Sequence, residues 1–310
     1  DIAHYYANHP FAPYALSPDA DFPVTNIEKA HYSPRFSASW EKTVSPGVRV
    51  LALDGGIRVN VAPANCTCLV ENADRTQLEA VLKRVSGETG VSLTAVYEGN
   101  TAKITAVGVQ AHASTPDEGK NAITATLQVL CALPLAQGAA EKTVQQLHEL
   151  FPYGDNRGKA LGIAMEDAVS GCLTLTFSMV HLDSTGFWGV FDSRDPLCAT
   201  EENTCHVTEA KMAAFGWECK GSLGPAHAVD GESDFIKVLL NAYETYTGRK
   251  GYCEAIGGGT YVHEIPGGVA FGAGEHDFDS HLHGANERAR ISQLLKTAMI
   301  YALVISKLCA

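Results

Sequence analysis

The hydrophobic period of the central part of the chain switches between two residues and 3.6 residues, and this limits the fold more than any other feature. From about Ser37 to Val107 apolar and polar residues mostly alternate, as in half-buried strands, and one helical stretch interrupts them. That helix ends at Gly90, a residue suited to a left-handed cap. The strands are predicted at 48–56, 57–61, 66–71, 92–99, 101–108, 172–183 and 186–196, and the helices at 75–90, 121–136, 141–151 and 211–218. Strand, helix and strand thus occur twice between about 36 and 226, which predicts two similar halves of one α+β domain.

The segments on either side of this region have a different character. Residues 1–35 are rich in Pro, His and aromatic residues and show no clear helical period. Beyond Gly224 the pattern predicts a helix, a short buried strand and a long terminal helix, at 234–248, 268–274 and 287–308. That piece is too small to stand alone. We therefore expect 1–35 and 227–310 to form one α/β domain into which 36–226 is inserted.

Charge and cysteine content exclude several classes of protein. The 310 residues carry a formal charge of -12, whereas nucleic acid and anionic lipid are bound by clustered Lys and Arg. The nine cysteines are an odd number and lie often inside apolar runs, which indicates buried reduced thiols of a cytoplasmic protein. No apolar run long enough for a membrane span and no signal pattern is evident. Because the chain begins with Asp1, we expect a processed or partial chain.

Two polar turns carry side chains that could bind a metal. His283 precedes the terminal helix, close to His276 and His281, and acids are interleaved with them. Imidazole and carboxylate groups are the usual nitrogen and oxygen ligands of zinc, but such a cluster is more often a solvated loop. Asp19, next to Pro18 in SPDADFP, can be a ligand or a turn residue.

Three further stretches place reactive groups beside turns. His112, in VQAHASTPDEGKNA, follows a strand and precedes a turn, so its imidazole can project towards a ligand; a structural histidine is the alternative. Arg194, in FDSRDP, suits a carboxylate or forms a local salt bridge. The glycines of IGGGTY allow a backbone to approach a small substrate, although such turns are common.

Together these stretches resemble one family. SPDADFPVTNIEK, GGIRVNVAPA, AHASTPDEGKNA, FDSRDP, AIGGGTY and LHGANE occur in the order and rough spacing of the peptidase V-like dipeptidases. These dipeptidases belong to the co-catalytic zinc peptidases, with carnosinases, aminoacylases, acetylornithine deacetylase and succinyl-diaminopimelate desuccinylase. The resemblance spans nearly the whole chain and implies part of an α/β catalytic domain with an inserted, internally doubled α+β lid.

The resemblance also implies a metal centre. Asp19 is similar to the carboxylate ligand of one Zn²⁺ and His283 to the imidazole ligand of the other, with two Zn²⁺ in a complete active site. In the family a zinc-bound water attacks the peptide carbonyl and a glutamate is the general base. Hydrolysis then proceeds without a covalent intermediate.

Other positions are expected to bind the substrate. His112 resembles the lid histidine that donates a hydrogen bond to the oxyanion, and Arg194 and Asn60 resemble the lid residues that hold the free carboxylate of a dipeptide. The residues expected to line the cleft are Gly258, Gly259 and Thr260.

The sequence departs from the family in two respects. It contains no HxDxVP-like run and no Asp-Glu-Glu run, so the remaining ligands and the general base are missing. Two ligands cannot enforce a four-coordinate zinc, and we expect this chain to be inactive unless the N-terminal half of the catalytic domain is supplied. In addition, His263 stands where the family's GGGTYAR-like turn has an arginine, which leaves the substrate preference open.

Three functions remain open. The chain is part of a zinc dipeptidase for short peptides with a free carboxylate, or a non-catalytic binding or interaction remnant of that family, or a deacylase for N-acyl amino acids. The doubled lid favours the dipeptidase, because it supplies within one chain what smaller relatives obtain from a dimer partner.

Overall fold

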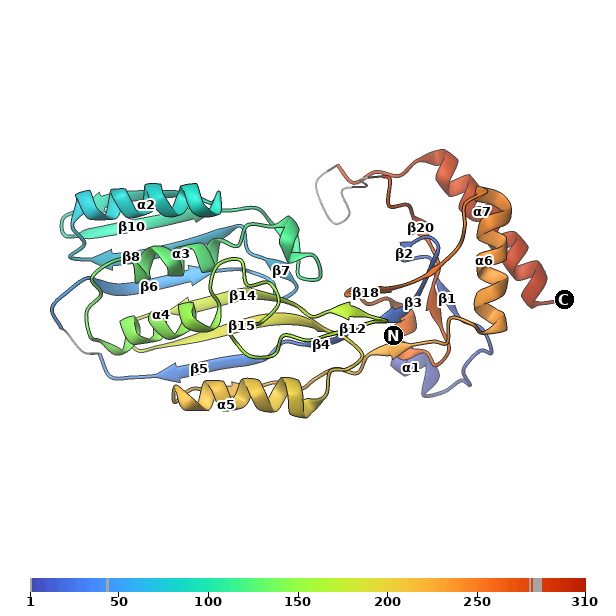
Figure 1. Ribbon diagram of the computed structural model, residues 1–310, viewed down its shortest axis with the longest axis horizontal. Coiled ribbons are helices and arrows are strands. Elements are labelled where there is room, and N and C mark those ends of the chain that lie inside the picture. The colour runs from blue at the N-terminus through green and yellow to red at the C-terminus, as the bar shows by residue number, and fades with distance from the viewer. Residues whose placement is uncertain (1, 43–44, 279, 281–285) are drawn as a thin grey trace. The chain divides into compact units, whose positions relative to one another are not determined.

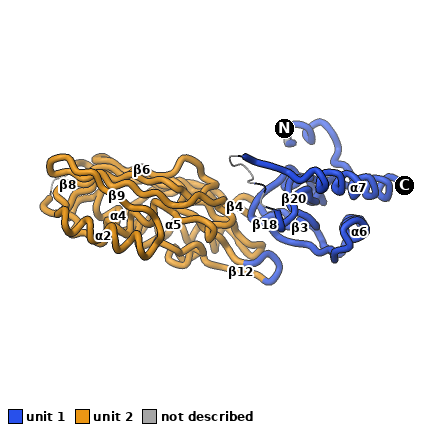
Figure 2. Tube along the Cα trace, turned by 90° about the horizontal axis from the view of Figure 1, so that it is seen from above, with its two compact units in different colours: residues 1–29, 168–171, 225–310 blue, residues 30–167, 172–224 orange. Residues whose placement is uncertain are grey.

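The computed structural model of the chain describes residues 2–42, 45–278, 280 and 286–310 (Figure 1). It divides into two compact units, coloured blue and orange in Figure 2. Unit 1 comprises 1–29, 168–171 and 225–310, and unit 2 comprises 30–167 and 172–224. The limits predicted from the sequence lie after 35 and after 226. The mixed α/β fold class is confirmed.

Unit 2 is built on one nine-stranded antiparallel sheet. The strands follow the order β16-β5-β15-β14-β6-β8-β10-β9, and β4 also pairs with β15. Four neighbouring strands, β6, β8, β10 and β9, come from the first half of the unit, and β14, β15 and β16 come from the second. The bounds are β4 Ala30–Tyr32, β5 Arg35–Ser39, β6 Arg49–Gly55, β8 Asn65–Glu71, β9 Ser92–Glu98, β10 Thr101–Val107, β14 Thr174–Leu182, β15 Gly186–Asp195 and β16 Glu218–Lys220.

Helices cover one face of this sheet (Figure 1). The first helix begins where the carboxylate of Asp74 accepts from the backbone N–H of Gln77, and it ends at Gly90 in the left-handed conformation with φ 67°, as predicted. The core between the layers is aromatic, and the rings of Phe151 and Phe177 stack with centroids 4.5 Å apart. The helices are α2 Arg75–Thr89, α3 Ala122–Cys131, α4 Ala139–Leu150 and α5 His206–Ala214, the last preceded by a π-helical turn at Glu201–Cys205.

Short elements at one end of unit 2 position the candidate site. They are β7 Val61–Ala62, β11 Ala111–His112, the 3-10 turn η1 Pro116–Glu118, and the hairpin of β12 Glu166–Asp167 and β13 Gly171–Cys172, whose tip is assigned to unit 1. The stretch 57–61 was predicted as a strand, and this is wrong for its first four residues. They form a bend and a turn. Apolar and polar residues alternate there, but the side chain of Ile57 is 88% exposed, so the alternation does not mark a buried face.

Unit 1 contains a five-stranded mixed sheet. Its central strand β3, Val24–Glu28, is buried at every residue and pairs with β18 in parallel and with β17 and β19 antiparallel. The absence of a two-residue alternation explains why the sequence pattern does not reveal this strand. The other strands of this sheet are β1 Leu16–Ser17, β17 His227–Ala228, β18 Cys253–Ile256 and β19 Val269–Ala270, and a separate parallel pair is formed by β2 Ala20–Asp21 and β20 Ala273–Gly274.

Two long helices complete unit 1, and α6, Asp234–Thr247, packs against α7, Ile291–Leu308. Ile300 and Val304 of α7 are fully buried in the core of this unit. By length and composition α7 could also cross a membrane, but core helices of globular proteins share these properties. It begins at 291 rather than at the predicted 287. The remaining helices are α1 Ile2–Tyr6 and the 3-10 turn η3 Tyr261–Glu264.

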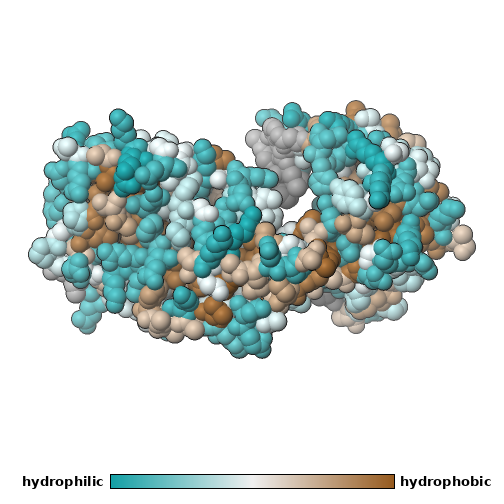
Figure 3. Space-filling model, in the orientation of Figure 1, coloured by the Kyte–Doolittle hydropathy of each residue, from teal (hydrophilic) through white to brown (hydrophobic). Residues whose placement is uncertain are grey.

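Hydrophilic side chains cover much of the face of each unit that Figure 3 shows, with smaller apolar patches among them. This distribution is ordinary for a chain with a formal charge of -12.

Candidate active-site segments

The structure brings two of the predicted lid residues together. Strands β7 and β11 pair antiparallel with Val61 opposite His112, and the N–H of Ala113 donates to the carbonyl oxygen of Asn60 at 3.0 Å. The turn that leads into β7 depends on Gly56, whose φ is +75° and where a Cβ would lie 1.8 Å from a backbone oxygen. Asn60 and His112 are thus held on adjacent backbone segments.

The imidazole of His112 is oriented by Ser114. The backbone N–H of Ser114 donates to Nδ1 of His112 at 3.2 Å, and the Ser114 hydroxyl lies 2.6 Å from the same nitrogen. A nitrogen that accepts from a backbone N–H carries no proton, so the neutral ring has its proton on Nε2. The ring is half-buried. It therefore presents Nε2–H as a hydrogen-bond donor.

The backbone that carries His112 is tied to the sheet of unit 2. The hydroxyl of Thr174 in β14 donates to the carbonyl oxygen of Ala113 at 3.3 Å. Further along, Asn121 caps α3 by accepting from Ile123 and Thr124, and its amide donates to the carbonyl oxygen of Phe177 at 2.8 Å. These bonds fix both ends of the segment, which gives the imidazole a rigid base.

Arg194 lies on β15 and forms a bidentate pair with Asp192. Its Nε donates to Oδ1 at 2.7 Å and its Nη2 to Oδ2 at 3.0 Å. The side chains are 13% and 3% exposed, so this pair is largely desolvated. The local salt bridge considered as an alternative is therefore present, and it fixes the plane of the guanidinium.

In unit 1, a buried carboxylate holds the glycine-rich turn after β18. Glu28 is 1% exposed and accepts from the backbone N–H of Thr260 at 3.1 Å, from its hydroxyl at 2.7 Å and from Nδ1 of His263 at 2.9 Å. Gly258 and Gly259 lie at the start of this turn. Neither is required to be glycine by packing, because an added Cβ would come no closer than 3.7 Å to a neighbouring atom.

The surroundings of His263 favour its protonated form. Its Nδ1 faces Glu28 and its Nε2 lies 2.9 Å from the carbonyl oxygen of Pro225, so both nitrogens face acceptors. The hydrogen bond to Glu28, opposed by burial, raises the pKa of His263 above 6.5. These contacts thus favour a positive charge at the position where an arginine was expected.

The predicted metal ligands receive less support. Asp19 lies in an exposed bend between β1 and β2, and His283 lies outside the described residues. Nearby in unit 1, His276 Nδ1 is 3.2 Å from Asp21 Oδ2 and His276 Nε2 is 3.4 Å from Glu254 Oε1. Burial raises the pKa of Glu254.

Within 2–42, 45–278, 280 and 286–310 no three His, Cys, Asp or Glu side chains come together as a metal site. These residues alone do not fit a zinc shell, which needs four ligands.

Two residues that position the candidate groups were not predicted: Glu28 and Ser114. Ser114 stands only two residues after His112, so its hydroxyl could have been recognised in the sequence as a partner of the imidazole. Glu28 is more than 200 positions from Thr260, and only the fold connects them.

One part of the chain matches a family model, and nearly the whole chain matches curated relatives. Residues 97–181 match the family model of a peptidase dimerisation domain. A putative dipeptidase, YtjP, of Bacillus subtilis is 27% identical over 309 residues, which are 99% of this chain and 66% of that protein. A Beta-Ala-Xaa dipeptidase of Lactobacillus delbrueckii subsp. lactis is 28% identical over 309 residues, or 99% and 65% of the two chains.

A solved structure gives a weaker match. The crystal structure of an aminoacylhistidine dipeptidase from Vibrio alginolyticus has a TM-score of 0.47 and 14% identity, over 93% of this chain and 64% of that one. The chain spans about two thirds of the length of the curated relatives it matches.

Proposed function

Since the chain is a member of the M20 (peptidase V-like) dipeptidase family, we propose that it carries the lid and C-terminal part of a dipeptidase that cleaves short peptides with a free C-terminal carboxylate. The family relationship supports a hydrolase. Dipeptide substrates follow from the relatives, whose names include a Beta-Ala-Xaa dipeptidase. An N-acyl amino acid offers the same carboxylate and an amide bond, and it remains the alternative substrate.

The observation that carries this proposal is the orientation of His112. Ser114 leaves Nε2 of the neutral ring as the donor, and the β7 and β11 ladder holds the ring beside Asn60. A fixed donor stabilises the oxyanion of a tetrahedral intermediate more than the uncharged carbonyl of the substrate, because charge develops on that oxygen. We assign this step to His112.

Arg194 is proposed to bind the carboxylate of the substrate. Asp192 takes Nε and Nη2 of the guanidinium, so its plane is fixed before the substrate arrives. A preorganised fork loses little side-chain entropy on binding, which favours a planar carboxylate partner. Asn60 would add a neutral amide donor. Gly258, Gly259 and Thr260 are proposed to line the cleft, with their backbone ordered by Glu28.

Two Zn²⁺ are proposed for the complete enzyme, with Asp19 and His283 among their ligands. When bound, the metal would supply an activated water for attack on the peptide carbonyl. The described residues do not complete its coordination shell, so the steps assigned above belong to the protein groups alone.

A further polypeptide segment is proposed to complete the catalytic domain. The chain matches 65–66% of its curated relatives, which therefore contain sequence beyond the matched part. On α7, Ile291, Leu294, Leu295 and Met299 follow helical spacing and are 47–77% exposed. Gln293, Ile300 and Val304 on the opposite side are buried, so α7 is apolar on two faces. An apolar face of a helix is normally covered by other residues. We propose that the complementing segment covers the exposed apolar face of α7.

We also propose a cytoplasmic location. All nine cysteines are free thiols, and burial raises the pKa of Cys66 to about 12, which makes it unreactive. These properties suit a reducing compartment.

The proposal is tested by assaying the chain together with the complementing third of a relative, in Zn²⁺, on three substrates. These are a dipeptide, the same dipeptide amidated at its C-terminus, and an N-acetyl amino acid. A dipeptidase prefers the free dipeptide. A preference for the N-acetyl amino acid would establish the deacylase instead, and absence of both activities and of bound zinc would indicate the non-catalytic remnant.

A further inference from the structure

We propose that His263 is a positioning residue that orders the glycine-rich turn after β18 only while its ring is protonated, so that affinity for the substrate falls at alkaline pH. The turn contains Gly258, Gly259 and Thr260, which line the cleft of the proposed enzyme. The effect on substrate affinity rests on the proposed dipeptidase function, whereas the ordering of the turn does not.

Both ring nitrogens of His263 face acceptors. Nδ1 lies 2.9 Å from Oε2 of Glu28, and Nε2 lies 2.9 Å from the carbonyl oxygen of Pro225. A neutral imidazole has one N–H, whereas a protonated imidazole has two. The neutral ring would therefore leave one of these acceptors facing a nitrogen lone pair, and only the protonated ring satisfies both.

Glu28 couples the protonation of this ring to the turn. Its carboxylate is 1% exposed, and it also accepts from the backbone N–H of Thr260 at 3.1 Å and from the Thr260 hydroxyl at 2.7 Å. A buried anion that loses its positive partner is strongly destabilised. Loss of the His263 proton therefore favours movement of the carboxylate towards water, and that movement would release Thr260.

Packing around the two glycines of the turn is loose. A Cβ added at Gly258 or at Gly259 would find its nearest atom 3.7 Å away, and at Gly259 that atom is Oε2 of Glu28 itself. Glycine also gives the backbone the widest choice of conformations. The order of the turn therefore depends strongly on the hydrogen bonds of Glu28.

The groups that face His263 favour its protonated form. The hydrogen bond to Glu28 on β3, opposed by burial, raises the pKa of His263 above 6.5, and the charge of Glu264 on η3 acts in the same direction. On β17 the ring of His227 has its centroid 6.0 Å from that of His263, and its Nε2 lies 2.6 Å from the carbonyl oxygen of Gly268.

The other elements that pack against η3 bring no acidic or basic side chain into this contact. Strands β1 and β19 consist of Leu16, Ser17, Val269 and Ala270. Helix α1 packs its Tyr6 into the apolar cluster of Val262 and Ile265, and its His4 and Tyr5 are exposed.

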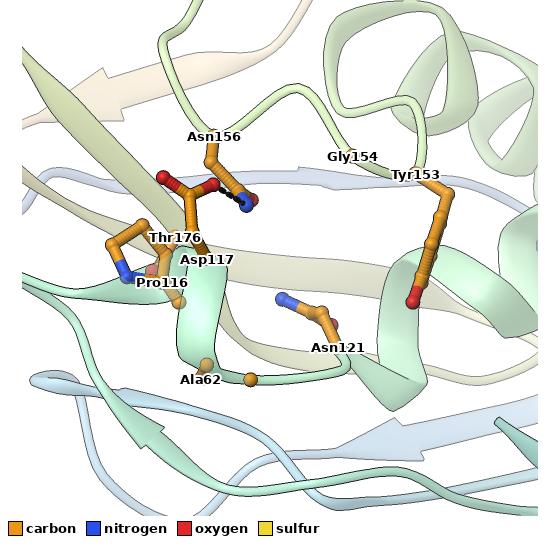
Figure 4. A pocket seen from close by; sticks show the side chains of 9 residues that line it. Ala62, Pro116, Asp117, Asn121, Tyr153, Gly154, Asn156 and Thr176 are labelled. Carbon is orange, nitrogen blue, oxygen red and sulfur yellow. Dashed lines mark hydrogen bonds between the residues drawn. The ribbon is translucent and has the colours of Figure 1, made fainter. Parts of the chain in front are cut away.

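A carboxylate of unit 2 shows how much the partner matters. Asp117 accepts from the amide of Asn156 (Figure 4) and from Arg157, both at 2.7 Å, and its side chain is 61% exposed. Neither donor loses its proton between about pH 6 and pH 9. This contact should therefore be insensitive to pH over that range, whereas the contact of Glu28 should not.

Hydrogen exchange at the backbone N–H of Thr260 tests the ordering in the complete chain. Its protection factor should fall by about tenfold or more between about pH 6 and pH 9, the value of one charge-assisted hydrogen bond written as a ratio. H263Q should give low protection at both pH values, and H263R, which keeps the charge, should give high protection at both. Either variant decides the test if the other fails to fold.

Two controls isolate His263. The backbone N–H of Ala160 in unit 2 also donates to a carboxylate, Oδ2 of Asp155 at 2.7 Å, and its protection factor should not change with pH. H227Q replaces the neighbouring imidazole by a side chain that can still donate to Gly268, and it should keep the pH dependence of Thr260. Constant protection of Thr260 in the unmodified chain, unchanged pH dependence in H263Q, or its loss in H227Q would each overturn the ordering.

Steady-state kinetics of the complemented, zinc-loaded enzyme test the effect on the substrate. The KM for a dipeptide, taken relative to that of H263R at the same pH, should rise over the same interval by up to the same factor, while the ratio of kcat values stays constant. A KM ratio that does not change with pH would overturn this effect. Absence of turnover at every pH would refute the dipeptidase function and the effect on affinity with it, while the exchange of Thr260 still decides the ordering.

Discussion

The carboxylate of Glu28 lies 2.9 Å from Nδ1 of His263 and joins the central strand of unit 1 to the glycine-rich turn after β18. The same carboxylate accepts the backbone N–H and the hydroxyl of Thr260. A buried anion is stable only when it is paired and hydrogen-bonded, and here both conditions are met. The turn proposed to line the substrate cleft is therefore ordered by one charged contact.

The stability of unit 1 should depend on the protonation of His263. Its pKa is raised above 6.5 in the folded state. Its contribution to the free energy of unfolding is therefore complete below pH 6.5 and is lost as the pH rises through the pKa of the folded state. Hydrogen exchange of β3 and β18, followed between about pH 5 and pH 9, should show this loss. H263Q should remove the pH dependence, and the exposed control H206Q should retain it. An identical slope in H263Q would contradict the assignment.

Removal of Glu28 should be costly. E28A leaves the His263 cation and the Thr260 N–H without their buried partner, and breaking a buried pair typically costs about 3 to 5 kcal/mol. The control E264A removes an exposed carboxylate and should change stability by less than about 0.5 kcal/mol.

Calorimetry measures the stability change in E28A. Tryptophan fluorescence serves as an internal reference, because Trp40, Trp188 and Trp217 all belong to unit 2 and should report no change. A cost in E28A no larger than that in E264A would show that the contact does not order unit 1.

Arg194 should discriminate between free and amidated peptides. In the complemented enzyme, R194A should weaken the binding of peptides with a free carboxylate by about 1.5 to 3 kcal/mol, the value of a charge-assisted contact. The binding of amidated peptides should be weakened much less. R194K keeps the charge and should recover only part of the loss, since it cannot form the bidentate fork. Steady-state kinetics on both substrates measure this, and equal losses would restrict Arg194 to its pair with Asp192.

The exposed face of α7 should bind the complementing segment. L295E places a charge on that face and should abolish co-purification with the segment. It should leave the folding of the chain nearly unchanged, because Leu295 is 63% exposed. Q77E adds the same charge at an exposed position of α2, in unit 2, and should not affect binding. Partition of the unmodified chain into lipid vesicles instead would refute this assignment of the face.

Local patterns predicted part of the fold well. Helix α2 has an apolar period and a glycine after its last residue, and both act as expected. In contrast, β3 is buried on both faces and carries Thr25, Asn26 and Glu28 among its five residues. Neither an alternating nor a continuous apolar pattern marks it, and the side chains of Asn26 and Glu28 bond to partners more than 200 positions away.

The candidate site divides in the same way. His112 stands in a motif and its orientation depends on Ser114, two residues away, so a local reading reaches both. Glu28 bonds Thr260 and His263 across more than 200 positions, and no spacing rule connects them. The metal ligand role of His283 remains a prediction, since it lies outside the described residues.

The most direct test of the central claim is the turnover of a dipeptide by the complemented, zinc-loaded enzyme with and without the imidazole of His112. Loss of one oxyanion donor typically lowers kcat about 10²–10³-fold, so H112A should fall by this amount while KM changes little and the control H206A keeps full turnover. Undiminished turnover in H112A would contradict the account.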